Sequence, residues 1–211
     1  MEEKNYAREE HPALNLKLHM FHTSDMALQA TRWLVCERHH PPLRAIDEFD
    51  WKLNLAIHKD DLEKAFVIMA TCATTFNLGV FKIMAEGQAE LASREPGRRM
   101  IGREIVIYCN ANPEKQAQEW IEAIMAIEEA FKEAGIRPST EVSPDSNQRI
   151  GKYTSYTHGA WTVKRMDIPF KEGIKETALA DEDPFAAYEY DEKTEGPVLR
   201  DSGEKFSPSV N

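Results

Sequence analysis

The hydrophobic spacing of residues 51–156 constrains the fold more than any other feature of this sequence. It changes repeatedly between the two-residue period of a strand and the longer period of a helix. Strands are predicted at 51–58, 79–84, 103–109 and 152–156, with one helix opened by Asp60 or Asp61 and another running from Asn112–Pro113 to Gly135. The order strand–helix–strand–strand–helix–strand predicts an α+β fold: a compact single domain with a twisted, mostly antiparallel sheet and helices packed on one side.

The N-terminal part of the chain carries weaker patterns. Residues 24–38 combine an N-cap at Ser24 or Asp25 with helically spaced apolar side chains, which predicts a further helix. The alternating leucines of residues 14–18 fit either a short edge strand or a motif that docks on a partner.

Acidic side chains concentrate at the C-terminal end. The chain has a net charge of −10, and twelve acidic but only five basic residues fall in 166–211. An acidic protein is a poor general binder of nucleic acid, because phosphate neutralisation supplies most of that affinity. We therefore divide the chain into an N-terminal arm at 1–22, an α+β domain at 23–172, and an acidic tail at 173–211 that is partly docked and then disordered.

The sequence carries no pattern for a metal, a disulfide or a membrane. Cys36, Cys72 and Cys109 are widely spaced and lack a CxxC pair, so we expect free buried thiols in a reducing compartment. The histidines lack a carboxylate pattern that would complete a metal site. The charged N-terminus lacks the apolar region of a Sec signal peptide, and no stretch fits a membrane span, so we expect a soluble protein.

Basic residues recur on the polar faces of the predicted strands. Lys52 and Lys82 alternate with apolar residues that face the core, and Tyr108 faces away from its apolar neighbours. If these strands pair, two lysines, a tyrosine and several arginines border one concave surface. Such a surface would select phosphate, and a lysine held among other cations has a lowered pKa and can act as a general base. The alternative is that these side chains are solvated ends of strands and loops.

Several segments also resemble a known enzyme family. In order and spacing, the segments WKLNLAIHKDDLEKAF, VFKIM, GREIVIYCNANPEKQAQEWIEAI and GKYTSYTHGAW resemble the phosphothreonine lyases that bacteria inject into host cells. They equally resemble the lyase domain of class III and IV lanthionine synthetases, while the tail piece ALADEDPFAAY is similar to the effector lyases. The resemblance covers about residues 50–190.

The resemblance implies a β-elimination that needs no cofactor. Lys82 falls at the position of the general base that removes the Cα proton of phosphothreonine or phosphoserine, and Lys52 falls where a second lysine polarises the substrate. The remaining matches are to basic or phosphate-binding positions of the family: Arg98, Arg103, Tyr108, and Lys164 or Arg165. The implied partner is a phosphorylated protein or peptide, with a host kinase as one candidate, and the implied location is the host cytoplasm after injection, with the bacterial cytoplasm as the alternative.

Two residues depart from the family pattern. Asn54 stands where the family has a histidine general acid, and Thr157 stands where it has an arginine. An asparagine can hydrogen-bond a phosphate oxygen but cannot protonate it, and loss of a general acid costs roughly 10²–10⁴ in rate. His58 lies too far along the strand to replace it, so we expect His158 to be the substitute.

Three functions remain open on these residues. The first is catalysis, as a phosphothreonine or phosphoserine lyase-like enzyme. The second is phosphopeptide binding by a pseudoenzyme that has lost elimination together with the acid. The third is altered chemistry on another anionic ligand.

Overall fold

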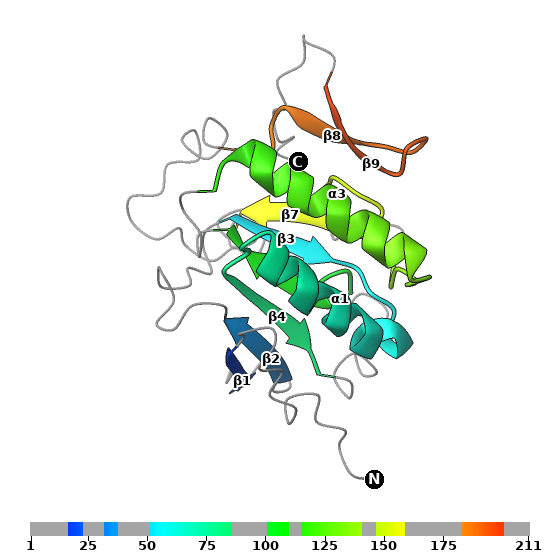
Figure 1. Ribbon diagram of the computed structural model, residues 1–211. Coiled ribbons are helices and arrows are strands. Elements are labelled where there is room, and N and C mark those ends of the chain that lie inside the picture. The colour runs from blue at the N-terminus through cyan, green and yellow to red at the C-terminus, as the bar shows by residue number, and fades with distance from the viewer. Residues whose placement is uncertain are drawn as a thin grey trace, which may run out of the picture.

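In the computed structural model, two helices of the described part of the chain cover one face of an antiparallel sheet (Figure 1). The structure describes residues 17–22, 32–37, 51–85, 101–109, 115–140, 147–158 and 183–200. The helices are α1 (Leu62–Thr75) and α3 (Ala117–Glu133). This arrangement confirms the predicted α+β fold class.

The sheet has seven strands in the order β1-β2-β4-β5-β3-β7-β6, and every pairing is antiparallel. In chain order the strands are β1 (Lys17–His22), β2 (Arg32–Glu37), β3 (Trp51–Leu55), β4 (Val80–Met84), β5 (Ile105–Tyr108), β6 (Gln148–Arg149) and β7 (Thr154–His158). Strand β3 lies between β5 and β7, although about 50 residues or more separate it in sequence from each of them. Residues far apart along the chain therefore become neighbours at the centre of the sheet.

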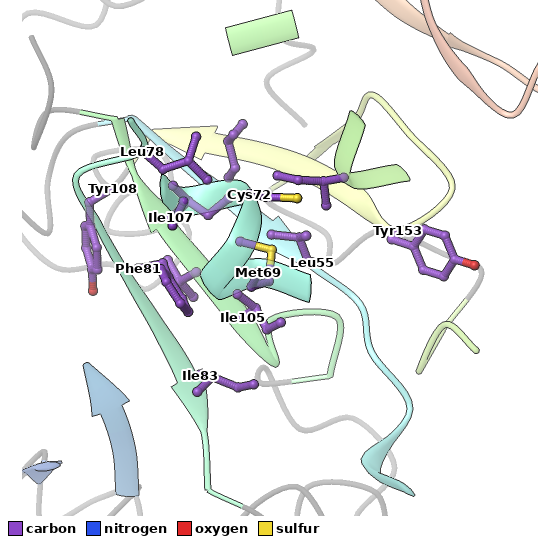
Figure 2. Close-up of a cluster of buried hydrophobic side chains, with 14 of the residues drawn as sticks. Leu55, Met69, Cys72, Leu78, Phe81, Ile83, Ile105, Ile107, Tyr108 and Tyr153 are labelled. Atoms are coloured by element: carbon purple, nitrogen blue, oxygen red, sulfur yellow. The ribbon is translucent and has the colours of Figure 1, made fainter. Parts of the chain in front are cut away.

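The core fills the space between the sheet and the helices. Figure 2 shows Met69 of α1 packed against Leu55, Phe81 and Ile105 of three different strands. Along each strand, core residues such as these alternate with residues that face away from the helices. The predicted alternation in β3, β4 and β5 is therefore confirmed.

Local signals set the ends of the helices. Asp61 is the N-cap residue of α1, as predicted. Helix α3 begins after Gln116, which forms a capping box with Glu119. Gly135 follows its C-terminal end with a φ of +66°, a left-handed conformation that glycine adopts at little cost.

One helix prediction was wrong, and another helix begins later than predicted. In the segment predicted as a helix at 24–38, residues Arg32–Glu37 form strand β2, which pairs with β1 and β4. The helix predicted from Asn112–Pro113 is α3, and it begins at Ala117. Lys115 is outside α3, and Asn112 and Pro113 lie outside the described residues. In both segments an asparagine, serine or aspartate suggested a cap that the described helices do not use.

A hairpin in the acidic tail packs against the domain. Strands β8 (Tyr188–Asp191) and β9 (Gly196–Leu199) pair with each other, and Phe185 just before them is fully buried against Tyr156. Glu195 in the turn forms ion pairs with Lys132 and Lys152. The hairpin was not predicted, and the division of the tail into a docked and a disordered part stays a prediction; residues 201–211 lie outside the described residues.

A buried glutamate joins α3 to the turn before β7. The Glu128 carboxylate accepts hydrogen bonds from the backbone N–H groups of Tyr153 and Thr154 and from the Thr154 hydroxyl, at 2.6–3.2 Å. Gly151 permits this approach, because a Cβ at that position would collide with the carboxylate. The helix layer is thus fixed to the sheet by a polar contact as well as by the core.

All three cysteines are free and buried, as predicted, and burial raises the pKa of the Cys36 and Cys72 thiols. In the part of the chain that the structure describes, no helix is long and apolar enough to cross a membrane.

A second buried glutamate joins the ends of three segments. Glu104 precedes β5, and its carboxylate accepts hydrogen bonds from the backbone of Ile57 and Gly102 and from the Ser139 hydroxyl. Burial raises the pKa of Glu104 to about 7, more strongly than these hydrogen bonds lower it.

Glu104 therefore makes stability depend on pH. The folded state holds this proton more tightly than the unfolded chain, whose carboxyl titrates near 4.5. We expect the free energy of unfolding to fall by up to about 3 kcal/mol as pH rises from about 4.5 to 7, and to level off above that. Chemical denaturation of Glu104→Gln across this range should lose that slope; parallel curves for the two proteins would contradict the assignment.

Candidate functional site

The face of the sheet opposite the helices carries most of the polar residues that the sequence singled out. Lys52 and Asn54 alternate with the core residues Leu53 and Leu55 of β3, and Lys82 lies between two core residues of β4. The strand pairing places Tyr108 directly opposite Lys52, and Val106 opposite both Asn54 and Lys82. Directly opposed residues share a face, so one face gathers these side chains from β3, β4 and β5.

Lys52 and Lys82 converge on the ring of Tyr108. The Nζ atoms lie 5.9 Å and 5.2 Å from the ring centroid, and Lys82 Nζ also lies 4.7 Å from the ring of Trp33 in β2. At these distances an ammonium group is attracted to an aromatic face by about 0.5–2 kcal/mol. Both rings are almost fully buried, so they hold two half-buried cations at a fixed position on the sheet.

Asn54 is the most buried polar residue of this face. Its side chain is only 2% exposed, and its Nδ2 group has no hydrogen-bond partner in the structure. Ser155, directly opposite on β7, accepts a hydrogen bond from Asn147 at 2.9 Å. A buried donor without an acceptor costs about 1–3 kcal/mol, so an acceptor supplied by a ligand at this point would be stabilising.

Arg103 is linked to this polar face by a hydrogen bond to Asn147, the residue before β6. Its guanidinium donates to Asn147 Oδ1 at 3.1 Å, and Asn147 in turn donates to Ser155. Asn147, Ser155 and Thr157 are all more than nine-tenths buried. A line of polar side chains therefore runs from Arg103 to the position beside Asn54.

The structure does not bring His158 to this face. His158 is directly opposite Trp51, whose ring it contacts edge-on at 4.9 Å between centroids. Trp51 alternates with Lys52 along β3, so His158 lies on the helix side of the sheet while Thr157 lies opposite Lys52. Arg98, Lys164 and Arg165 lie outside the described residues.

Three residues of this face were not predicted as part of the site. Trp33 was assigned to a helix, so its approach to Lys82 could not be seen. Asn147 and Ser155 are common loop and strand residues, and only the pairing of β6 with β7 and of β7 with β3 brings them beside Asn54. The two-residue spacing of Ser155 and Thr157, which places both on one face of a strand, was the only signal available.

The chemistry of this face suits an anion. It combines two ammonium groups, an arginine further along the face and the amide donor of Asn54. Among the residues that the structure describes, no three His, Cys, Asp or Glu side chains are grouped so that they could hold a metal ion.

Comparison with protein families and with curated proteins finds no match. Solved structures do match. The phosphothreonine lyase SpvC, an effector protein from Salmonella, aligns with a TM-score of 0.51 at 16% identity, over 82% of this chain and 75% of that one. The type III effector and phosphothreonine lyase OspF from Shigella flexneri aligns at 0.49 and 16% identity, over 73% and 75% of the two chains. At this identity the match shows the fold alone: the chain has the fold of a phosphothreonine lyase effector.

Proposed function

We propose that this protein is a phosphothreonine or phosphoserine lyase-like enzyme that eliminates phosphate from a phosphorylated protein or peptide without a cofactor. The observation that carries the proposal is the convergence of Lys52 and Lys82 on one aromatic ring, on the sheet face opposite the helices. Two cations fixed beside buried neutral donors suit a phosphate ester, and a lysine among them is placed to take a proton.

The proposed reaction balances with this chain's own groups. Lys82 Nζ takes the Cα proton of the phosphorylated residue, and the electron pair of that C–H bond forms the Cα–Cβ double bond. The Cβ–O bond breaks, and its electron pair leaves with the phosphate, which keeps the proton of a monoanionic ester or takes one from water. A dehydroamino acid remains in the peptide, and Lys82 returns its proton to water before the next turnover.

The other residues of the face bind and polarise the substrate in this proposal. Lys52 draws electron density from the substrate and so acidifies the Cα–H bond, while Tyr108 orients both lysines. Arg103 is placed to bind an anionic group further along the face. On the resemblance alone we assign Arg98, and Lys164 or Arg165, to the phosphate; His158 receives no role, because it lies on the other face.

A second candidate function is phosphopeptide binding without turnover. It is favoured by Asn54, which occupies the centre of the face with an amide that cannot transfer a proton to a leaving group. A binding protein of this kind would keep the lysines and the polar line from Arg103 to Ser155.

One assay separates the two functions. A phosphothreonine peptide incubated with the protein should lose the mass of phosphoric acid, and a thiol should add to the dehydroamino acid product, as followed by mass spectrometry. Asn54→His supplies an acid and should raise the rate at least tenfold. Binding that weakens with salt but gives no mass loss, in either protein, would instead support the binding module.

We propose further that the natural substrate is a host phosphoprotein, with a kinase as one candidate, and that the protein acts after injection into the host cell. This part of the proposal follows from the fold shared with effector proteins. Elimination from a phosphorylated kinase, compared with the same kinase without phosphate, would test it.

A further inference from the structure

The amide of Asn54 is placed to hold a leaving anion, and none of the residues that the structure describes accepts a hydrogen bond from its Nδ2 group. Asn54 lies at the middle of β3 with its Nδ2 group buried and without a partner. The Ser155 hydroxyl, on the residue directly opposite in β7, accepts a hydrogen bond from Asn147. The unused donor therefore belongs to the lysine face and to a ligand there.

The position of Asn54 relative to the base also follows from the pairing. Asn54 and Lys82 are both directly opposite Val106, on either side of β5. Two strand spacings separate their backbones, which is roughly 10 Å. A threonine or serine ester of a tetrahedral oxyanion can bind between them. Its Cα–H bond then meets the Lys82 amine, and an ester or terminal oxygen meets the Asn54 amide.

A neutral amide stabilises departing charge but supplies no proton. A phosphate monoester dianion would have to leave as a trianion unless it is protonated, and only its monoanion, populated below a pKa of about 6, carries its own proton. A sulfate monoester is different, because sulfate is the anion of a strong acid and departs as a stable dianion. The donor at position 54 is therefore matched to leaving groups that need no proton.

Resting on the proposed function, we infer that this face also eliminates sulfate from O-sulfated threonine or serine, with Asn54 as the hydrogen-bond donor to the leaving sulfate. Lys82 Nζ takes the Cα proton, the C–H electron pair forms the Cα–Cβ double bond, and the Cβ–O bond breaks with its pair going to sulfate. The peptide product is the same dehydroamino acid that phosphate elimination gives.

The experiment compares two peptides that differ only in the ester. Peptides with O-sulfothreonine or phosphothreonine at one position are incubated with the full-length protein at pH 6 to 9, and the dehydroamino acid is measured by mass spectrometry. We expect kcat/KM for the sulfate ester to exceed that for the phosphate ester at least tenfold at pH 8 and above. Asn54→Ala should lower it at least tenfold.

The variant Asn54→His should shift the preference from the sulfate ester toward the phosphate ester. By supplying a proton, it should lower the ratio of sulfate to phosphate elimination at least tenfold, whereas Glu129→His, an exposed substitution on α3, should leave the ratio unchanged. Phosphate elimination without sulfate elimination would overturn the inference and leave the proposed function standing. Elimination from neither ester would overturn both, and equal rates in Asn54→Ala and the unaltered protein would remove Asn54 from the role.

Discussion

Replacing Lys82 by alanine should reduce phosphate elimination by roughly 10²–10⁴, because the general base is lost while the rest of the face remains. The side chain is half-buried between the rings of Trp33 and Tyr108, so its removal takes away the only contact proposed for the Cα proton. Initial rates of dehydroamino acid formation from one phosphothreonine peptide measure the effect.

Two further lysine variants show whether the loss is chemical. Lys82→Arg keeps a positive charge but cannot lose its proton near neutral pH, so it should be as inactive as Lys82→Ala while binding the peptide better. Lys193→Ala, in the exposed turn of the β8–β9 hairpin, should keep full activity. If Lys82→Ala or Lys82→Arg retained more than a tenth of the rate, Lys82 would not be the base.

Replacing Glu128 by alanine should lower the free energy of unfolding by about 3–5 kcal/mol. The substitution leaves three buried donors without an acceptor: the backbone N–H groups of Tyr153 and Thr154, and the Thr154 hydroxyl. These donors begin β7, the strand that pairs with β3, so the lost contact weakens the attachment of α3 to the sheet. Urea denaturation followed by circular dichroism measures the change.

The matched control is the neighbouring residue of the same helix. Glu129→Ala changes an exposed carboxylate one position along α3 and should alter stability by no more than about 0.5 kcal/mol. A similar small effect for Glu128→Ala would show that water satisfies the three donors and that the contact is dispensable.

The alternation of polar and apolar residues was enough to predict the face on which the lysines lie. Lys52 and Lys82 each stand between residues that enter the core, and the structure keeps both on the opposite side. The order of the strands was not predictable in the same way, because β3 pairs with β5 and β7 through contacts that span 50 or more residues. Predicting that Lys52 and Lys82 meet at the ring of Tyr108 requires the strand register as well as the alternation.

The errors arose where local preference and tertiary pairing disagree. Residues 32–37 follow a plausible helix start, but Trp33, Val35 and Cys36 suit a strand, and pairing with β1 and β4 decides the outcome. His158 was proposed as an acid because it adjoins Thr157 in sequence. In a strand adjacent side chains point to opposite faces, so that adjacency placed it on the wrong side of the sheet.

The position of β3 has a consequence during synthesis of the protein. Strand β3 carries Lys52 and Asn54, and both strands that flank it, β5 and β7, are made later, the second ending only at His158. Until β7 has been made, β3 can pair on one side at most, with β5, and the polar face of the sheet remains incomplete. The polar face that carries the two lysines is therefore expected to form only after β7 has been made, about 100 residues after β3.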